Sequence, residues 1–244
     1  MTVTMSSRAE LRKSRQQPPT PEPPEPQLPV DHPPVVWKVV RLLFRLYFTV
    51  LFDLKVYGVR NVPRRGGVLL VSNHQSLLDP PLLGVRLERP MSYMAKSELF
   101  RRPWFEWLIR SLGAFPVKQG AGDVGAIKET VNRLQQGRML NIFPEGARTL
   151  TGEIGPMQSG VALVVRRAGV PLIPVAIHGS FEAWPKGARF WHSHPIRMVY
   201  GPPLDVTGMK GDQIVALIDR SIRTLYDKLR SGEMNDRVAA QPLK

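Results

Sequence analysis

The chain lacks cysteine: none of its 244 residues carries a thiol. This absence excludes a cysteine nucleophile, thiolate-bound metal centres and thiol redox chemistry. It is compatible with a reducing compartment. A chain of this length buries enough apolar surface, in one large domain or two small ones, to fold without disulfide cross-links.

Other signatures are missing as well. The sequence has no G-x-S-x-G motif, so the serine nucleophile elbow of the hydrolases is absent. There is no H-E-x-x-H motif, and His192 and His194 of WHSHP are too isolated to indicate a metal site, so we expect them in a loop. The first 33 residues lack an apolar h-region and a small-residue cleavage site, so no cleavable signal peptide is expected. We find no internal repeat.

Acidic residues are scarce relative to basic ones. The 34 lysines and arginines outnumber the 20 aspartates and glutamates, for a formal net charge of +14. Such a balance favours a polyanionic partner, either nucleic acid or an anionic membrane surface. The chain shows no nucleic-acid-binding motif with interleaved aromatic residues, so we expect the membrane surface and no nucleic acid.

The N-terminal part divides into two segments. Residues 1–34 are basic and then rich in proline, which excludes a regular helix or inner strand, so we expect a disordered segment outside the fold. Residues 35–55 begin with a long apolar stretch interrupted by Lys38, Arg41 and Arg45. The spacing of these cations places all three on one helical face, opposite an apolar face that we expect to hold Trp37, Val40, Leu43, Phe44, Tyr47, Phe48 and Leu51.

The same helix is a poor candidate for crossing a bilayer. Three central basic residues cost roughly 8–10 kcal/mol on insertion, and about fourteen apolar residues return roughly 4–8 kcal/mol. We therefore expect a membrane-associating amphipathic helix that lies in the interface. The alternatives are a spanning helix and an ordinary amphipathic helix packed on the domain. Trp104 and Trp107, beside Arg101 and Arg102, suit either interfacial anchoring or core packing.

Residues 56–232 alternate short β-rich runs with helical patterns, which predicts an α/β domain with a mostly parallel mixed sheet flanked by helices. We expect residues 233–244 to form a flexible tail. The predicted strands are 66–73, 92–95, 115–117, 138–146 (a strand that runs into a loop), 170–179 and 196–200. The predicted helices are 77–87, 103–112, 123–136, 159–168 and 209–229.

One candidate site lies in VSNHQSLLDPPLL, residues 71–83. A predicted strand ends at Ser72, and His74 stands just past its carboxyl end, where ligands bind in open α/β sheets. Asp79 follows at the start of the next helix and can fold back onto the imidazole, which fixes the tautomer and leaves the other nitrogen as a base. No protein nucleophile is evident, so the substrate's own hydroxyl is the simplest nucleophile. The alternative is a histidine that merely completes a loop.

A second candidate cluster is NIFPEGART, residues 141–149, which also follows a strand and therefore opens at the same edge. Gly146 permits a close backbone approach or a positive φ, and Arg148 suits bidentate phosphate binding. Glu145 can orient Arg148 or accept a bond from a substrate hydroxyl. The alternative is a turn with a solvated ion pair. With the preceding helix, the two clusters suit a lysophospholipid, which carries a hydroxyl and a phosphate.

Four sequence blocks resemble those of the glycerolipid acyltransferases, the bacterial 1-acylglycerol-3-phosphate acyltransferase family. NHQSLLD is similar to the N-H-x-x-x-x-D signature and FPEGART to the F-P-E-G-T-R block. LGAFPVKQ (112–119) stands where the family has its second block, and VPLIPVAIHGS (170–180) resembles its fourth. All four occur in the family's order.

The resemblance implies transfer of an acyl group from acyl-CoA or acyl-carrier protein to the sn-2 hydroxyl of lysophosphatidate, giving phosphatidate. These donors are substrates, and no cofactor or metal is expected. It implies that His74 is the base with Asp79 behind it, and that the acceptor phosphate is bound by Glu145, Gly146 and Arg148. Pro174 would shape the acyl or thioester site. The expected location is the cytoplasmic face of the cell membrane, as a peripheral or monotopic protein.

Two departures from the family pattern concern the acceptor. The second block often ends in Asp-Arg, but Lys118 and Gln119 stand there, and a lysine supplies a point charge without planar bidentate geometry. Ala147 replaces the usual threonine and removes a hydroxyl donor. These changes leave open another lysophospholipid or a lyso-amino-acid lipid as acceptor. A non-catalytic basic protein that binds lipid or nucleic acid is the remaining alternative.

Overall fold

The computed structural model describes residues 35–111, 113–117 and 124–243. The N-terminal segment 1–34, together with Lys118 and Gln119, lies outside the described residues. Within the described part, one seven-stranded sheet runs in the order β1-β7-β6-β2-β5-β3-β4. The strands are β1 (Lys55–Tyr57), β2 (Val68–Ser72), β3 (Met91–Lys96), β4 (Ala114–Val117), β5 (Met139–Ile142), β6 (Leu172–His178) and β7 (Arg197–Tyr200).

The sheet is parallel from β6 to β4, and the antiparallel β6–β7 pair makes it mixed. β2 lies at its centre and is buried along its whole length. Its side chains alternate between two apolar cores: Val68 and Leu70 belong to one, and Leu69 and Val71 to the other. A strand buried on both faces must be continuously apolar, which explains the VLLVS run. The predicted fold class is confirmed.

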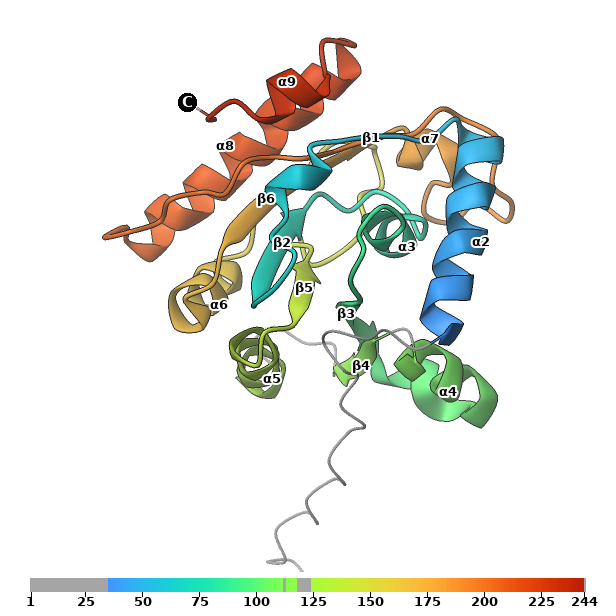
Figure 1. Ribbon diagram of the computed structural model, residues 1–244, viewed down its shortest axis with the longest axis horizontal. Coiled ribbons are helices and arrows are strands. Elements are labelled where there is room, and N and C mark those ends of the chain that lie inside the picture. Colours follow the sequence, from blue (N-terminus) through green and yellow to red (C-terminus); the bar gives the residue numbers. More distant parts are fainter. Residues whose placement is uncertain (1–34, 112, 118–123, 244) are drawn as a thin grey trace, which may run out of the picture.

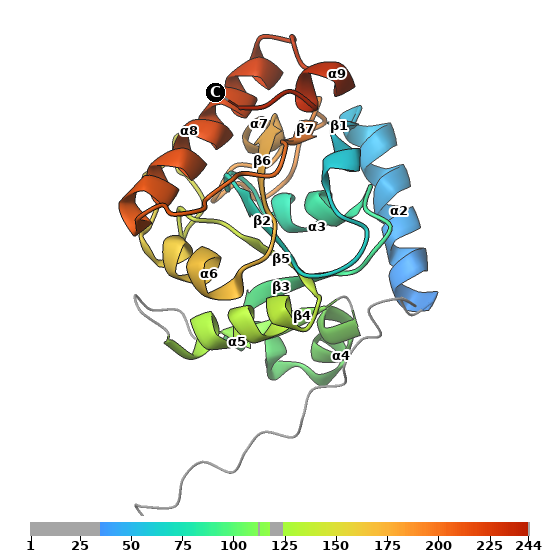
Figure 2. The same cartoon turned by 60° about the vertical axis from the view of Figure 1, so that its left-hand side comes forward.

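Helices cover both faces of the sheet (Figures 1 and 2). On one face lie α2 (Val35–Phe52), α3 (Asp79–Gly84) and α7 (Ser180–Ala183), and on the other α5 (Val124–Gln135), α6 (Gly160–Ala168) and α8 (Gly211–Arg230). Helix α4 (Pro103–Ser111) lies at the β4 end. In the described ranges, the other helical elements are two 3-10 turns, η1 (Val59–Asn61) and η2 (Ser97–Arg101), and the short α9 (Asp236–Ala239).

Helix α2 confirms the predicted helix but not the predicted division of its faces. Phe48 and Phe52 are fully buried in the core beside α3, so this helix is part of the domain. Arg41 lies on the packed side as well, where its Nη1 donates to the carbonyl of Leu87 at 3.1 Å and its guanidinium stacks over Trp37. We expected the aromatic residues of α2 to face lipid. Several of them pack against the core of the domain instead.

A second apolar face of α2 remains exposed. It consists of six aliphatic side chains, each half or more exposed: Val35, Val39, Leu42, Leu43, Leu46 and Val50. Their spacing of three, four, seven and eight residues forms a single stripe along the helix. Trp104 and Trp107 of α4 are also exposed, at 65% and 63%, so they are not core residues. Both views place α4 near the start of α2, at the same end of the molecule (Figures 1 and 2).

Among the residues that the structure describes, no helix combines the length and apolarity needed to cross a bilayer. The alternative of an ordinary amphipathic helix packed on the domain therefore holds for one face of α2. Its outer stripe is left uncovered within this part of the chain.

The C-terminal residues are not the loose tail that the sequence suggested. Met234 and Ala239 are buried, and α9 is capped by Asn235, whose side chain accepts bonds from the N–H groups of Arg237 and Val238. Asn61 then bonds to the carbonyl of Ala239 at 2.8 Å. The sequence predicted a flexible tail because a four-residue helix is too short to show an apolar period. The cap by Asn235 and the bond from Asn61 hold this helix in place.

Candidate active site

The two chemical clusters meet at one edge of the sheet. β2 and β5 are adjacent and parallel, so the loops that follow Ser72 and Ile142 both leave from the carboxyl ends of the strands. Asn73 extends this junction toward β6: its side chain donates to the carbonyl of Ile177 at 2.8 Å and accepts from the N–H of Ile177 at 2.9 Å. The asparagine before the histidine therefore has a structural role that sequence reasoning missed.

His74 and Asp79 form the predicted pair. His74 Nδ1 lies 2.9 Å from Asp79 Oδ2, and the same oxygen accepts from the N–H groups of Gln75 and Ser76 at 2.7 Å each. Asp79 is completely buried and is the first residue of α3, where the helix dipole favours a carboxylate. Three donors and a helix N-terminus thus hold this carboxylate in place.

The imidazole of His74 is fixed on its other sides too. Its ring stacks on Phe143 with 3.8 Å between ring centroids and 16° between planes. Because Asp79 accepts a hydrogen bond from Nδ1–H, the favoured tautomer carries its proton on Nδ1 and leaves the Nε2 lone pair available. Among the described residues, none bonds to Nε2, and the side chain keeps 17% of its surface exposed. The arrangement can accept a proton from a group that enters this edge.

Among the described residues, Glu145 forms no hydrogen bond or ion pair with Arg148, and its two oxygens accept from backbone N–H groups instead. Its Oε1 accepts from the backbone N–H of His74 at 2.7 Å, and its Oε2 accepts from the N–H of Gly155 at 2.7 Å. Burial raises the pKa of Glu145, while the bonds from Gly155 and His74 oppose that rise. A carboxylate whose two oxygens are both bound to backbone donors holds the loop that carries His74.

Gly146 adopts the positive φ that the sequence allowed, at 74°. A Cβ at this position would stand 2.1 Å from Gln158 Nε2, so the residue also permits a close approach. Gln158 bonds to this turn twice: its N–H donates to the carbonyl of Pro144 at 2.8 Å, and its side chain to the carbonyl of Glu145 at 3.3 Å. The turn that bears Arg148 is therefore tightly bound.

Arg148 is half-buried, and none of the described residues forms a hydrogen bond or ion pair with it. Its neighbour Thr149 donates its backbone N–H to the carbonyl of His74 at 3.0 Å, which brings the arginine to the histidine loop. A cation held at the site without an internal partner suits an anionic ligand.

Pro174 is not at the edge where it was expected. It lies inside β6, fully buried, paired with Val71 of β2 and packed against Gly201. Its missing N–H is tolerated because the β6–β7 pairing starts only at Val175. The sequence block was predicted correctly as a strand, and the role of Pro174 in shaping the acyl or thioester site stays a prediction.

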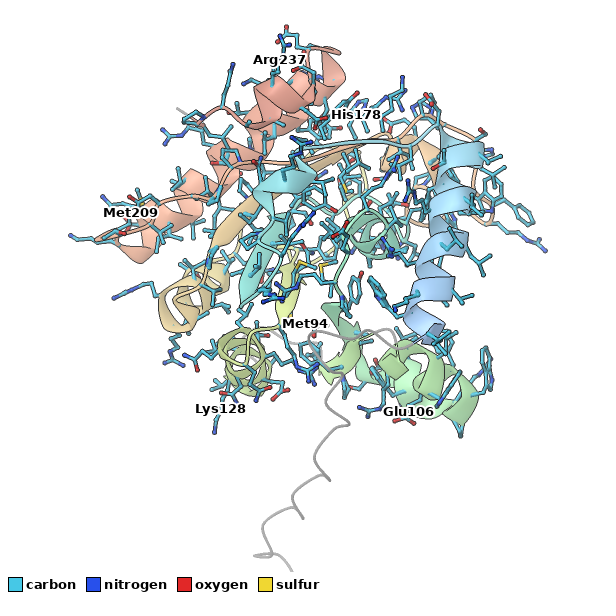
Figure 3. The ribbon with its side chains drawn as sticks, viewed as in Figure 1. Met94, Glu106, Lys128, His178, Met209 and Arg237 are labelled. Atoms are coloured by element: carbon cyan, nitrogen blue, oxygen red, sulfur yellow. The ribbon has the colours of Figure 1, made fainter. Side chains whose placement is uncertain are left out.

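Gln75 and Tyr226 are site neighbours that the sequence did not reveal. Gln75 Nε2 donates to the carbonyl of Gly152 and to the hydroxyl of Tyr226, the latter at 3.2 Å. Tyr226 comes from α8 and packs edge-on against His178, which ends β6 below that helix (Figure 3). Burial lowers the pKa of His178. No local pattern could have linked a residue of α8 to the histidine loop, since the contact depends on how α8 crosses the sheet.

The fold and the paired side chains define an α/β enzyme with a histidine–aspartate pair. A family model described as "Acyltransferase" matches residues 53–178, which include both clusters. Because this match covers more than half of the chain, the protein belongs to the acyltransferase family, and it is an enzyme. Family membership excludes the non-catalytic alternative.

Named relatives agree with the family. A 1-acyl-sn-glycerol-3-phosphate acyltransferase of Bacillus subtilis is 30% identical over 151 residues, which cover 62% of this chain and 73% of the relative. A lyso-ornithine lipid O-acyltransferase of Pseudomonas aeruginosa is 34% identical over 136 residues, or 55% of this chain and 51% of the relative. The crystal structure of the 1-acyl-sn-glycerophosphate (LPA) acyltransferase PlsC from Thermotoga maritima matches with a TM-score of 0.69 and 26% identity, over 79% of each chain.

Proposed function

We propose that this enzyme transfers an acyl group from acyl-CoA or acyl-carrier protein to the sn-2 hydroxyl of 1-acylglycerol-3-phosphate, with His74 as the general base. The product is phosphatidate. One observation carries the proposal: the His74–Asp79 pair is joined through backbone bonds to the turn that presents Arg148. A base, His74, and a permanently charged side chain, Arg148, lie at one edge of the sheet. Together they suit an acceptor that has a hydroxyl and a phosphate.

In this mechanism, His74 Nε2 takes the proton of the acceptor hydroxyl as its oxygen attacks the thioester carbonyl. A carbon–oxygen bond forms, and the tetrahedral intermediate then collapses with cleavage of the carbon–sulfur bond. The imidazolium returns its proton to the departing thiolate, so the enzyme ends as it began. Asp79 supports this cycle because a buried carboxylate at Nδ1 stabilises the transient imidazolium.

Arg148 is the proposed ligand of the acceptor phosphate. It is the member of the predicted phosphate clamp whose side chain is accessible and unpaired among the described residues, since both carboxylate oxygens of Glu145 are occupied. A guanidinium can bind two phosphate oxygens at once. Arg148→Met should therefore raise the KM for lysophosphatidate, and leave the KM for a matched monoacylglycerol acceptor without phosphate unchanged.

We propose that the enzyme works at a membrane surface, on its cytoplasmic face, as a peripheral or monotopic protein. The exposed stripe of α2 and the two exposed tryptophans of α4 offer apolar surface at one end of the molecule. Lys38 and Arg45 flank the stripe, and Arg101 and Arg102 precede α4, all of them exposed. Apolar burial together with basic flanks is the combination that favours an anionic interface.

The direct test is acyl transfer by the purified protein in vesicles, with acyl-CoA and acyl-carrier protein each offered as donor. We expect lysophosphatidate to be converted to phosphatidate and His74→Ala to reduce the rate by about 10²–10⁴-fold. The melting temperature of His74→Ala shows whether the variant is folded, since the substitution also removes a donor to the buried Asp79. An unchanged rate in a folded His74→Ala protein would rule out the base.

A second acceptor class is favoured by the match to the lyso-ornithine lipid enzyme, at 34% identity. Such an acceptor has a free hydroxyl but no phosphate. A panel of lysophosphatidate, lyso-ornithine lipid and other lysophospholipids separates the candidates. Preference for lysophosphatidate that disappears in Arg148→Met supports the first proposal, and preference for the lyso-ornithine lipid in both proteins supports the second.

A further inference from the structure

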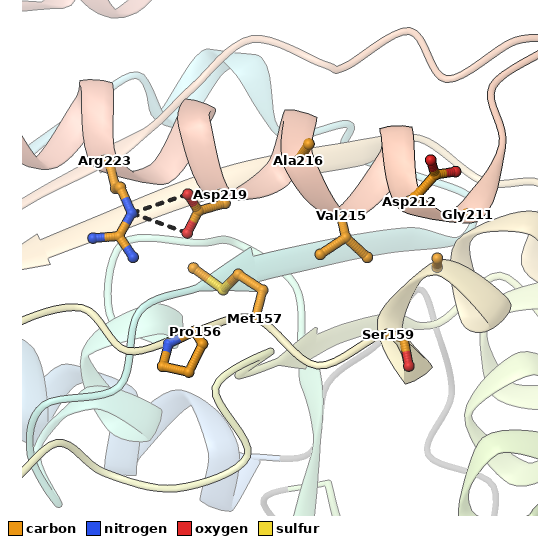
Figure 4. Close-up of a pocket in the computed structure, with 10 residues that line it drawn as sticks. Pro156, Met157, Ser159, Gly211, Asp212, Val215, Ala216, Asp219 and Arg223 are labelled. Atoms are coloured by element: carbon orange, nitrogen blue, oxygen red, sulfur yellow. Dashed lines mark hydrogen bonds and ion pairs between the residues drawn. The ribbon is translucent and has the colours of Figure 1, made fainter.

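An ion pair on α8 lies outside the matched family region and behind the candidate active site. Arg223 Nε donates to both carboxylate oxygens of Asp219, at 2.9 and 3.0 Å, one helical turn away. The pair lines an open groove between α8 and the start of α6 (Figure 4). An ion pair of this kind contributes little by itself at a solvated surface, so its significance depends on what else Arg223 holds.

The guanidinium of Arg223 also reaches the loop that precedes α6. Its Nη2 donates to the carbonyl of Ile154 at 3.0 Å and to the carbonyl of Gly155 at 3.3 Å. The side chain of Ile154 is buried in the same apolar cluster as Ile214 and Ile218 of α8. Asp219 orients the guanidinium of Arg223, and the buried side chain of Ile154 fixes the loop. Both partners of the bond between Arg223 and the loop are therefore held in place.

The peptide group between Ile154 and Gly155 is shared by two partners. Its carbonyl accepts from Arg223, and its N–H donates to Glu145 Oε2 at 2.7 Å. The peptide is planar, so fixing the carbonyl also fixes the direction of the N–H. The other oxygen of Glu145 accepts from the backbone N–H of His74 at 2.7 Å. One continuous set of bonds thus runs from Asp219 to the loop that carries the base.

We propose that Arg223 is a positioning residue for the acyl transfer: by orienting the 154–155 peptide, it holds Glu145 in place and thereby sets the backbone of His74. The inference rests on the proposed function of His74 as base. Arg223 touches neither substrate nor the imidazole, so its removal should lower kcat and leave the KM for the acceptor unchanged.

The test is a double-mutant cycle on the full chain, with Arg223→Met, Glu145→Gln and the double variant. Arg230→Met is the matched control, because Arg230 forms an exposed pair with Asp227 on the same helix. We expect Arg223→Met to lower kcat about tenfold, the worth of a hydrogen bond to a charged group. The control should keep the wild-type kcat. In the Glu145→Gln background, Arg223→Met should cause less than a twofold further loss.

Melting temperatures and a conservative variant distinguish positioning from simple destabilisation. Arg223→Lys keeps the charge and can reach a carbonyl, so it should recover part of kcat. Two results would overturn the inference: an unchanged kcat in folded Arg223→Met, or the same fold-loss in both Glu145 backgrounds. The rate of His74→Ala distinguishes the two proposals. If His74→Ala loses activity but Arg223→Met does not, the positioning role of Arg223 is wrong and the role of His74 as base stands.

Discussion

The backbone N–H of Thr149 donates to the backbone carbonyl of His74 at 3.0 Å. This bond ties the loop after β5 to the loop after β2 without any side chain. Glu145 adds a second tie through the N–H of the same histidine. The backbone of His74 is therefore held at both its N–H and its carbonyl, and Thr149, the neighbour of Arg148, is tied directly to it.

Asp79→Asn should damage both catalysis and stability. The oxygen that remains can accept the existing bonds, but the new amide nitrogen would replace Oδ1, a fully buried atom with no partner among the described residues. An unsatisfied buried donor costs about 1–3 kcal/mol. The rate should fall at least 100-fold because the imidazole loses its tautomer control. Urea unfolding and the acyl-transfer rate measure the two effects, and the His74→Ala protein, which loses the imidazole but keeps the Asp79 carboxylate, is the comparison.

Glu145 should make stability and activity respond to pH in opposite directions. Its pKa is raised by burial, so the folded chain binds a proton at pH values where the unfolded chain has released it. The free energy of unfolding should therefore fall as the pH rises from the ordinary glutamate pKa through the raised value. Activity should rise over the same window, because a protonated carboxyl accepts more weakly from the two N–H groups than a carboxylate does.

Unfolding free energies and kcat of the wild type and of Glu145→Gln, measured from about pH 4 to pH 7, check this prediction. The variant cannot titrate at this position, so its stability slope should be flatter in that window. Identical slopes in the two proteins would show that Glu145 does not titrate there.

Gly146→Ala should cost more than a substitution that only strains the backbone. Gly146 and Gly66 have nearly the same φ, 74° and 78°, but an added Cβ meets Gln158 Nε2 at the first and nothing within 4 Å at the second. Both variants should lose about 1 kcal/mol from the left-handed conformation. Gly146→Ala should lose more and should also lower kcat, since Gln158 must leave the turn. Equal unfolding free energies would contradict the role of Gln158.

The exposed stripe of α2 can be tested without disturbing the core. Leu42→Glu and Leu46→Glu change side chains that are 56% and 54% exposed. If the stripe binds lipid, each change should weaken co-sedimentation with anionic vesicles about tenfold or more, with little change in melting temperature. Val124→Glu, at a 71% exposed position on α5, is the matched control. Deleting the whole helix would be uninformative, because Phe48 and Phe52 belong to the core.

Much of the fold was predictable because its signals are local. The VLLVS run, the alternation of strands with helices, and the glycine that ends α6 all appear within short windows of sequence. The face of α2 was not predictable in the same way. Its aromatic and aliphatic residues are all apolar, and only the position of α3 decides which of them are buried.

The site divides along the same line. The pairing of His74 with Asp79 follows from a turn within one segment, and the sequence indicated it. The partners of Glu145 could not be read from the sequence, because a glutamate beside an arginine looks like an ion pair until the loop around Gly155 is in place. The place of Pro174 inside β6 was not predictable for a related reason: a motif shows which residues recur together but not which of them reach the edge.

The contacts of α9 also concern the order in which the molecule can be completed. The N–H of Gly58 bonds to the side chain of Asp236, and Asn61 bonds to the carbonyl of Ala239. Residues just after β1 therefore bond to residues that are synthesised much later. Contacts between such distant positions close the largest loops and form slowly. Because α9 is the last helix among the described residues, these two bonds can form only after it has been synthesised.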